Sequence, residues 1–154
     1  MNKNNAISLI NRENKRVPLT AKNTHWANLS VYGGQNGWWL NVPFNKFKEN
    51  LFFVLNNVHS GQMLLIDIPS NSITNPKSQF RNKRNTADIF ISAQSAQNLS
   101  DADQLIDIQS NGAGYDFSTF YVEVLEHFSD IGHLDNLYPE EVSNELKEGS
   151  KKLL

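Results

Sequence analysis

Short apolar stretches, separated by clusters of Gly, Pro, Asn and Ser, make up most of the chain as far as about residue 125. In residues 38–42 and 63–68 apolar side chains recur at every second position, which is the period of a strand with one buried face. Many short strands at such spacing predict a mostly β barrel or sandwich.

The expected strands are short apolar or alternating runs bounded by turn residues, and they span residues 17–20, 38–42, 63–68, 79–83, 87–92, 105–109 and 117–125. Residues 22–36 are polar and include Gly33 and Gly34, so we expect a hairpin-like or arm-like loop there. Apolar residues at helical spacing predict one helix over residues 45–55, and residues 111–114 (NGAG) predict a turn.

The end of the chain has a different pattern. Pro139 followed by two Glu is typical of the first turn of a helix, and the lysines at 147, 151 and 152 suit its last turn. This predicted helix either packs as a lid or leads into a further domain. We therefore expect one domain over residues 1–135 and a helix or linker over residues 136–154.

Composition excludes several classes of protein. The 154 residues include no Cys, which excludes disulfides, thiolate zinc sites and cysteine nucleophiles. No apolar run approaches the roughly 20 residues of a membrane span, and the amino terminus leads into no apolar signal core. We therefore expect a cytoplasmic protein with no membrane partner.

The net charge of −2 conceals two oppositely charged halves. Residues 1–86 carry 11 Lys plus Arg against three acids, whereas residues 87–154 carry three bases against 13 acids. Such asymmetry raises the hypothesis of binding to nucleic acid or another anionic surface, although charge alone slightly favours two opposite halves that attract each other in the fold. Asn, whose amide suits the reading of base edges, has 17 of its 21 occurrences before residue 87.

Motifs for metal, phosphate or nucleophilic chemistry are not recognisable. The four His do not have zinc-site spacing, Asp101 and Asp103 lack the remainder of a calcium loop, and no phosphate-binding GK[ST] sequence occurs. Asp107 and Glu123 can lie on adjacent strands as a metal-dependent nuclease would require, but no Lys accompanies them. We therefore expect no cofactor, no metal and no catalysis by this chain.

Residues 77–86 (KSQFRNKRNT) interleave four cations with Gln, two Asn and one aromatic residue. Lys and Arg bind phosphates through counterion release, while Arg, Gln and Asn can contact base edges in pairs of hydrogen bonds. A single charged strand face is often only solvated, but the polar loop over residues 22–36 supplies a second donor-rich arm. The two segments together favour nucleic-acid binding.

Residues 33–43 (GGQNGWWLNVP) resemble the Gly-rich turn, strand and Pro of B3-like DNA-binding domains in bacterial restriction endonucleases, including McrB-like restriction subunits. Residues 80–84 (FRNKR) resemble the basic second arm of that family, and residues 111–114 resemble its closing turn. The similarity spans residues 15–128. Gln35 stands where the family usually has His, so the resemblance does not imply a particular target sequence.

This resemblance implies a mostly β fold with two short helices, arranged as a seven-stranded open pseudo-barrel whose two arms grip the major groove. It implies site-specific recognition of double-stranded DNA within a restriction-modification system, with a nuclease or motor domain or subunit as partner. The positions carried over to the two arms and to phosphate contacts are Lys22, Asn23, Asn28, Ser30, Tyr32, Gln35, Asn36, Lys46, Lys48, Lys77, Gln79, Arg81, Asn82, Lys83, Arg84 and Asn85. Two alternatives stay open: a protein-interaction module with a basic face, and a small metal-dependent nuclease that uses Asp107 and Glu123.

Overall fold

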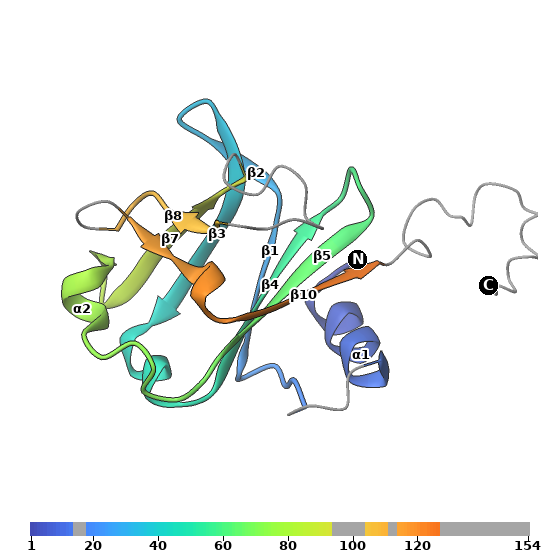
Figure 1. Cartoon of the computed structure of the whole chain (residues 1–154), viewed down its shortest axis with the longest axis horizontal. Coiled ribbons are helices and arrows are strands. Elements are labelled where there is room, and N and C mark those ends of the chain that lie inside the picture. Colours follow the sequence, from blue (N-terminus) through green and yellow to red (C-terminus); the bar gives the residue numbers. More distant parts are fainter. Residues whose placement is uncertain (14–17, 94–103, 111–113, 127–154) are drawn as a thin grey trace, which may run out of the picture.

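The computed structural model describes residues 1–13, 18–93, 104–110 and 114–126, which form a mostly β fold with two short helices (Figure 1). The helices are α1 (Lys3–Glu13) and α2 (Pro76–Gln79), and single 3-10 turns occur at η1 (Phe44–Lys48) and η4 (Phe117–Thr119). The strands are β1 (Thr24–Asn28), β2 (Ser30–Tyr32), β3 (Gln35–Pro43), β4 (Leu51–Asn57), β5 (Gln62–Ile68), β6 (Arg81–Lys83), β7 (Thr86–Ser92), β8 (Ile106–Asp107), β9 (Tyr115–Asp116) and β10 (Tyr121–Glu126). The coarser prediction of a mostly β fold with two short helices is confirmed. The described strands form two open sheets, of four and six strands, and no closed barrel.

Sheet A contains the strands β1-β4-β5-β10 in that order, with β1 parallel to β4 and the other pairs antiparallel. Its strand β4 is buried on both faces, because Phe53 points into the core between the sheets while Phe52 and Val54 point the other way. A strand covered on both sides is typically a continuous apolar run. The helix predicted over residues 45–55 is therefore wrong: only the turn η1 is helical, and the apolar run that follows forms β4.

Sheet B has the order β2-β3-β7-β8-β9. Strand β6 also pairs with β7, on the side opposite β3. Trp38 and Leu40 of β3 lie opposite Ile91 and Ile89 of β7, and all four side chains are buried. The strands predicted over residues 38–42, 63–68 and 87–92 are confirmed. Strands β5 and β7 each start one residue earlier than expected, and β3 extends from Gln35 to Pro43. The alternation of residue types located these strands because every second residue of each strand is apolar and packs against the core.

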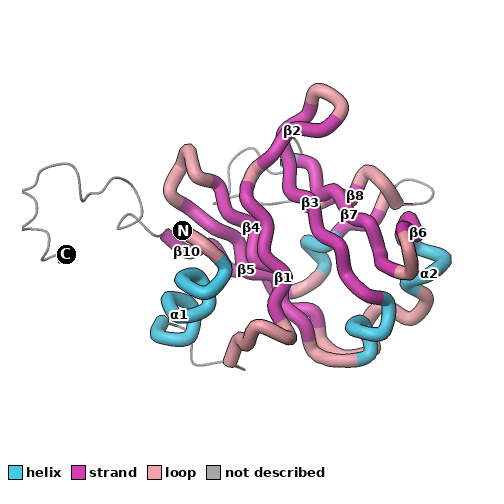
Figure 2. The backbone as a smooth tube through the Cα atoms, turned by 180° about the vertical axis from the view of Figure 1, so that it is seen from behind, coloured by secondary structure: helices cyan, strands magenta, loops and turns pink. Residues whose placement is uncertain are grey.

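The main core lies between the two sheets and includes the stacked rings of Phe47, Phe80 and Phe117. A second cluster lies on the other face of sheet A, where α1 covers β4 and β5 (Figure 2). Helix α1 was not predicted, because only Ala6 and Ile10 in it are fully buried and so leave a weak periodic signal. Within the described residues no helix is long and apolar enough to span a membrane.

Two predictions near the start of the chain need correction. Residues 18–20 are not a strand. The backbone amide of Leu19 instead donates a hydrogen bond to Oδ1 of the Asn11 side chain at 2.8 Å. The stretch 22–36, predicted as a loop, contains β1 and β2 as well as a tight turn. Strand β1 was not predicted, because only Thr24 and Ala27 of its five residues are buried and its sequence therefore shows no apolar alternation.

The later predicted strands are shorter than expected. Residues 79–83 divide between α2, which begins at Pro76, and the short strand β6, and only Ile106–Asp107 of residues 105–109 are extended. The strand predicted over residues 117–125 starts only at Tyr121, because the side chain of Asp116 caps the turn η4 by accepting a hydrogen bond from the Ser118 amide at 2.9 Å. Residues 111–113 and the predicted C-terminal helix lie outside the described residues.

Candidate nucleic-acid interface

The face of sheet B that points away from the core, which we call the outer face, carries five of the predicted arm residues by strand register: Ser30, Tyr32, Gln35, Arg81 and Lys83. Directly opposed residues of antiparallel strands share a face, so the register places Trp39 beside Phe90 and Asn41 beside Asp88. Arg81 of β6 lies on the other side of Asp88. Three strands therefore bring one row of polar side chains together.

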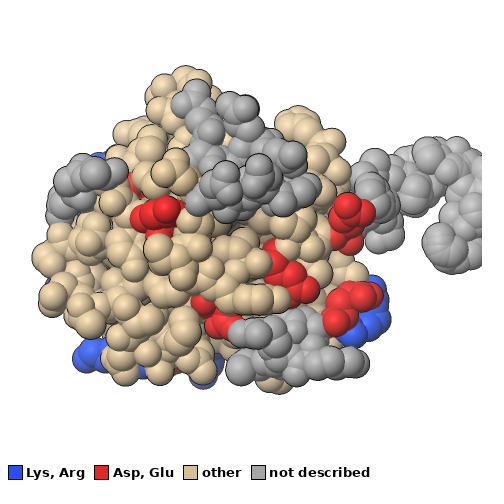
Figure 3. All heavy atoms as spheres, viewed as in Figure 1, with Lys and Arg blue, Asp and Glu red and all other residues tan. Residues whose placement is uncertain are grey.

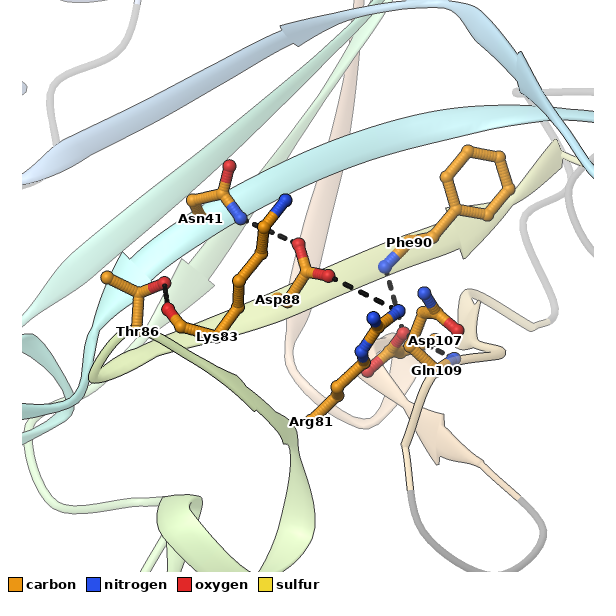
Figure 4. A network of polar contacts seen from close by, with 8 residues as sticks. All are labelled: Asn41, Arg81, Lys83, Thr86, Asp88, Phe90, Asp107 and Gln109. Atoms are coloured by element: carbon orange, nitrogen blue, oxygen red, sulfur yellow. Dashed lines mark hydrogen bonds and ion pairs between the residues drawn. The ribbon is translucent and has the colours of Figure 1, made fainter.

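Asp88 is the buried centre of this row (Figure 4). The side-chain amide of Asn41 donates to its Oδ1 at 2.7 Å, and Nη1 of Arg81 lies 3.6 Å from its Oδ2. The side chain of Asp88 is 4% exposed, whereas that of Arg81 is 52% exposed. The carboxylate thus restrains the guanidinium, while about half of the Arg81 side chain stays accessible to a ligand.

The hairpin between β6 and β7, which we call the second hairpin, has a two-residue loop. Lys83 pairs with Thr86, and both loop residues, Arg84 and Asn85, have positive φ, of 54° and 66°. Two positive φ angles define a type I′ turn, which matches the twist of the flanking strands. Oδ1 of Asn82 accepts from the Asn85 amide at 3.0 Å, so Asn82 supports the turn that presents Arg84.

The hairpin between β2 and β3, which we call the first hairpin, turns at Gly33 and Gly34, whose φ angles are 59° and 78°. This confirms the turn that these glycines predicted. Oε1 of Gln35 accepts from the Ser92 hydroxyl at 2.8 Å, which fixes the first hairpin against β7. The ring of Tyr32 packs against Trp39 and Phe90, with centroid separations of 4.8 and 5.3 Å.

The two hairpins lie at opposite ends of the same outer face (Figure 2). Gly37 pairs with Ser92 beside the first hairpin, and Pro43 pairs with Thr86 beside the second. The eight residue steps from Gln35 to Pro43 span about 27 Å at the usual rise of a strand. The hairpins therefore flank one face of sheet B, and their tips do not meet.

The remaining predicted contact residues do not all belong to this face. Lys22 and Asn23 precede β1, and Oδ1 of Asn23 accepts from the Thr20 amide at 2.7 Å in a local turn. Oδ1 of Asn28 accepts from the Asn56 side chain at 2.7 Å, within sheet A. Ser30 and Asn36 are exposed on the first hairpin, Gln79 ends α2, and Lys46, Lys48 and Lys77 lie on η1 and α2.

Acidic residues occupy a different part of the surface. Figure 3 shows several Asp and Glu side chains on the face that includes β10, with Lys and Arg at its edges. Asp107, proposed with Glu123 for the nuclease alternative, lies on β8 of sheet B, whereas Glu123 lies on β10 of sheet A. These strands are not adjacent, which corrects that expectation.

The carboxylate of Asp107 is buried and held by hydrogen bonds within the fold. Burial raises the pKa of its carboxyl, although the amides of Phe90 and Gln109 and the hydroxyl of Ser110 donate to it. Among the described residues no group of three or more His, Asp or Glu is placed to hold a metal ion. His127, His133, Asp101 and Asp103 lie outside the described residues.

His25 on β1 is neutral at ordinary pH. Burial, together with the smaller effect of the nearby charges of Lys3 and Lys46, lowers its pKa to about 4. Its Nε2 is buried without a hydrogen-bond partner, and its ring meets Phe53 edge to face at 6.1 Å. Protonation would place an uncompensated charge in this site.

We expect the free energy of unfolding to fall as the pH is lowered from about 6.5 to about 4, by up to about 3 kcal/mol from His25 alone. The unfolded chain binds a proton over this range and the folded chain does not, so stability is greatest above it. Denaturant unfolding at several pH values should show this slope in the native chain and lose it in His25→Gln. A matched variant of the exposed His59, His59→Gln, should keep the slope, and an identical slope in all three chains would contradict the prediction.

Several residues of the outer face were missed by sequence reasoning, namely Trp39, Asn41, Asp88 and Phe90. They are the alternate positions of two correctly predicted strands, so the same two-residue period assigns them to the face opposite the core. The polar residues Asn41 and Asp88 within these apolar strands were the available signal. No family model, curated protein or solved structure matches the chain significantly.

Proposed function

We propose that this chain is a DNA-recognition domain that binds a specific double-stranded sequence through the outer face of sheet B and its two hairpins. The observation that carries this proposal is the arrangement around Asp88, where Arg81 is held by a buried carboxylate and remains half exposed. Such a guanidinium is restrained in advance, and Arg is the side chain that most often reads guanine in the major groove.

Further support comes from the second hairpin. Lys83 and Arg84 are exposed beside Arg81, and Figure 4 shows Lys83 extending to the same side of the sheet as Arg81 and Asn41. A two-stranded ribbon is narrow enough to enter the major groove, which is about 12 Å wide. In this proposal the second hairpin enters the groove, and exposed lysines outside it contact phosphates and so position the duplex.

The first hairpin supplies a different chemistry. Asn36 is exposed, and Gln35 and Tyr32 lie on the outer face where the strand register places them together. Amide side chains can pair with adenine, and an aromatic ring can contact the thymine methyl group or a sugar. With about 27 Å between the hairpins, we propose that they meet successive parts of one binding site.

This proposal includes the fold and setting that the resemblance to B3-like domains implies. The sheets are joined where β1 passes through Leu29 into β2, and we propose that they form an open pseudo-barrel of that type. The chain would recognise DNA in the cytoplasm without catalysing a reaction. Cleavage would belong to a nuclease or motor domain or subunit of the same restriction system.

The proposal is tested first by selecting bound duplexes from a random library and then by measuring affinity for the selected duplex and a scrambled one. We expect Arg84→Ala to reduce the ratio of the two affinities by about tenfold or more, since one base-specific pair contributes about 1–3 kcal/mol. Fluorescence anisotropy at one fixed salt concentration measures both affinities.

Arg12→Ala is the matched control, because Arg12 is an exposed cation on α1, on the far side of sheet A. It should leave the affinity ratio unchanged. Two results would contradict base recognition. One is that the selection yields no common sequence, and the other is that Arg84→Ala lowers the affinity for both duplexes equally, so that the affinity ratio is unchanged, as with Arg12→Ala. That result would favour the alternative of a basic surface that docks an acidic protein.

A further inference from the structure

An open pocket of about 680 Å³ lies between η1 and α2, at the end of sheet B that carries the second hairpin. Phe44, Pro43 and Pro76 provide its apolar wall, and Asn85 of the second hairpin belongs to its rim. Its volume is within the range of about 300–1,000 Å³ that is usual for small-molecule sites. A lone phosphate ion would fill only a small part of it.

The pocket is positively charged. Lys48 and Lys77 line it, and none of its lining residues is Asp or Glu. Nζ of Lys77 lies 6.0 Å from the centre of the Phe44 ring, which holds the ammonium group over the apolar wall by a cation–π contact. Among the described residues neither lysine forms an ion pair, so both charges are available to an anion.

Amide groups complete the lining. Asn45, Asn75 and Asn85 line the pocket and are exposed, and an amide side chain can both donate and accept hydrogen bonds. Donor and acceptor pairs of this kind match the edge of a nucleobase, while the apolar wall suits its flat face. Two cations, three amides and an apolar wall together fit a planar heteroaromatic group that carries a phosphate.

We propose that this pocket binds a nucleoside monophosphate, with Lys48 and Lys77 at the phosphate and the asparagines at the base. The ligand is either a free nucleotide or the 5′-phosphorylated end of a DNA strand, which present the same chemistry. Asn85 also belongs to the second hairpin, but the lining residues do not include Arg81 or Arg84, so nucleotide binding here does not require that the chain read a DNA sequence.

The test is a titration of the full chain, isotopically labelled for NMR, with each deoxynucleoside monophosphate, with inorganic phosphate and with adenosine. We expect at least one nucleotide to bind about tenfold more tightly than phosphate or adenosine, with the largest shifts at Lys48, Asn75, Lys77 and Asn85. Lys77→Gln should weaken binding by about tenfold, because it removes one charge-assisted hydrogen bond. The exposed Arg12→Gln, on α1 and outside the pocket, should leave nucleotide binding unchanged, and the spectra themselves show whether each variant is folded.

Short single strands with and without a 5′-phosphate distinguish the two sources. Binding of the phosphorylated strand alone, at least as tightly as the nucleotide, assigns the pocket to strand ends; binding of the nucleotide alone assigns it to a free ligand. Equal affinity for phosphate and nucleotides, or unchanged binding by Lys77→Gln, overturns the proposal. Sequence-specific duplex binding that depends on Arg84 can survive that outcome, so the two proposals fail independently.

Discussion

Gly37→Ala is expected to destabilise the fold by about 3 kcal/mol, near the upper end of the usual cost of overpacking a buried site. A Cβ atom at this position would collide with the carbonyl oxygen of Ile91 and with the Phe90 ring. Neither neighbour can yield easily, because Ile91 contributes backbone and Phe90 is fully buried. Strands β3 and β7 would have to separate beside the first hairpin.

Chemical denaturation followed by fluorescence measures this loss. Asn36→Ala, one residue away and exposed, is the control and should change the stability by less than about 0.5 kcal/mol. If Gly37→Ala retained native stability, the close approach of Phe90 to β3 would be wrong. Placement of the aromatic rings on the outer face would then need revision.

Asp88→Asn is expected to reduce the discrimination between selected and scrambled duplexes by about tenfold or more, although Asp88 is too buried to touch DNA. Asparagine can keep the hydrogen bond with Asn41, but it loses the charge that holds Arg81. Removal of a negative charge should at the same time strengthen binding to every duplex at low salt. Lower specificity together with higher non-specific affinity identifies Asp88 as a positioning residue.

Glu123→Gln provides the matched control, because it removes the same charge from β10 of the other sheet. It should leave discrimination unchanged. If Asp88→Asn lowered both affinities equally while the fold stayed intact, Asp88 would have only a structural role. In that event Arg81 would not be the residue that reads the sequence.

The strands that sequence analysis located share one property, which is a set of alternating apolar residues on the face that packs against the main core. Residues 38–42 and 87–92 alternate because one side of sheet B packs against the core. The same rule failed for residues 45–55, where Phe44, Phe47, Leu51 and Leu55 fit helical spacing equally well. Only the presence of α1 on the far side of sheet A explains why Phe52 and Val54 are also apolar, and so why this run is a strand.

In the candidate site, too, the sequence predicted the features that depend on local residues and missed those that depend on distant ones. Gly33 and Gly34 indicated the first hairpin, since glycine adopts positive φ without strain. The turn at Arg84 and Asn85 has the same backbone geometry without glycine, so its exact position was not predicted, although its residues were included among the candidates. The pairing of Asn41 with Asp88 joins positions 47 residues apart, and nothing local to either residue indicates it.

Local composition thus determined which strand faces turn inward and which two polar segments carry the amides and cations, because burial imposes a short period on neighbouring residues. Strand order and register were decided by the tertiary structure alone. They depend on how the two sheets and α1 pack together to cover both faces of β4. That packing, rather than any motif, aligned Asn41, Asp88 and Arg81 across three strands and left the Arg81 side chain half exposed.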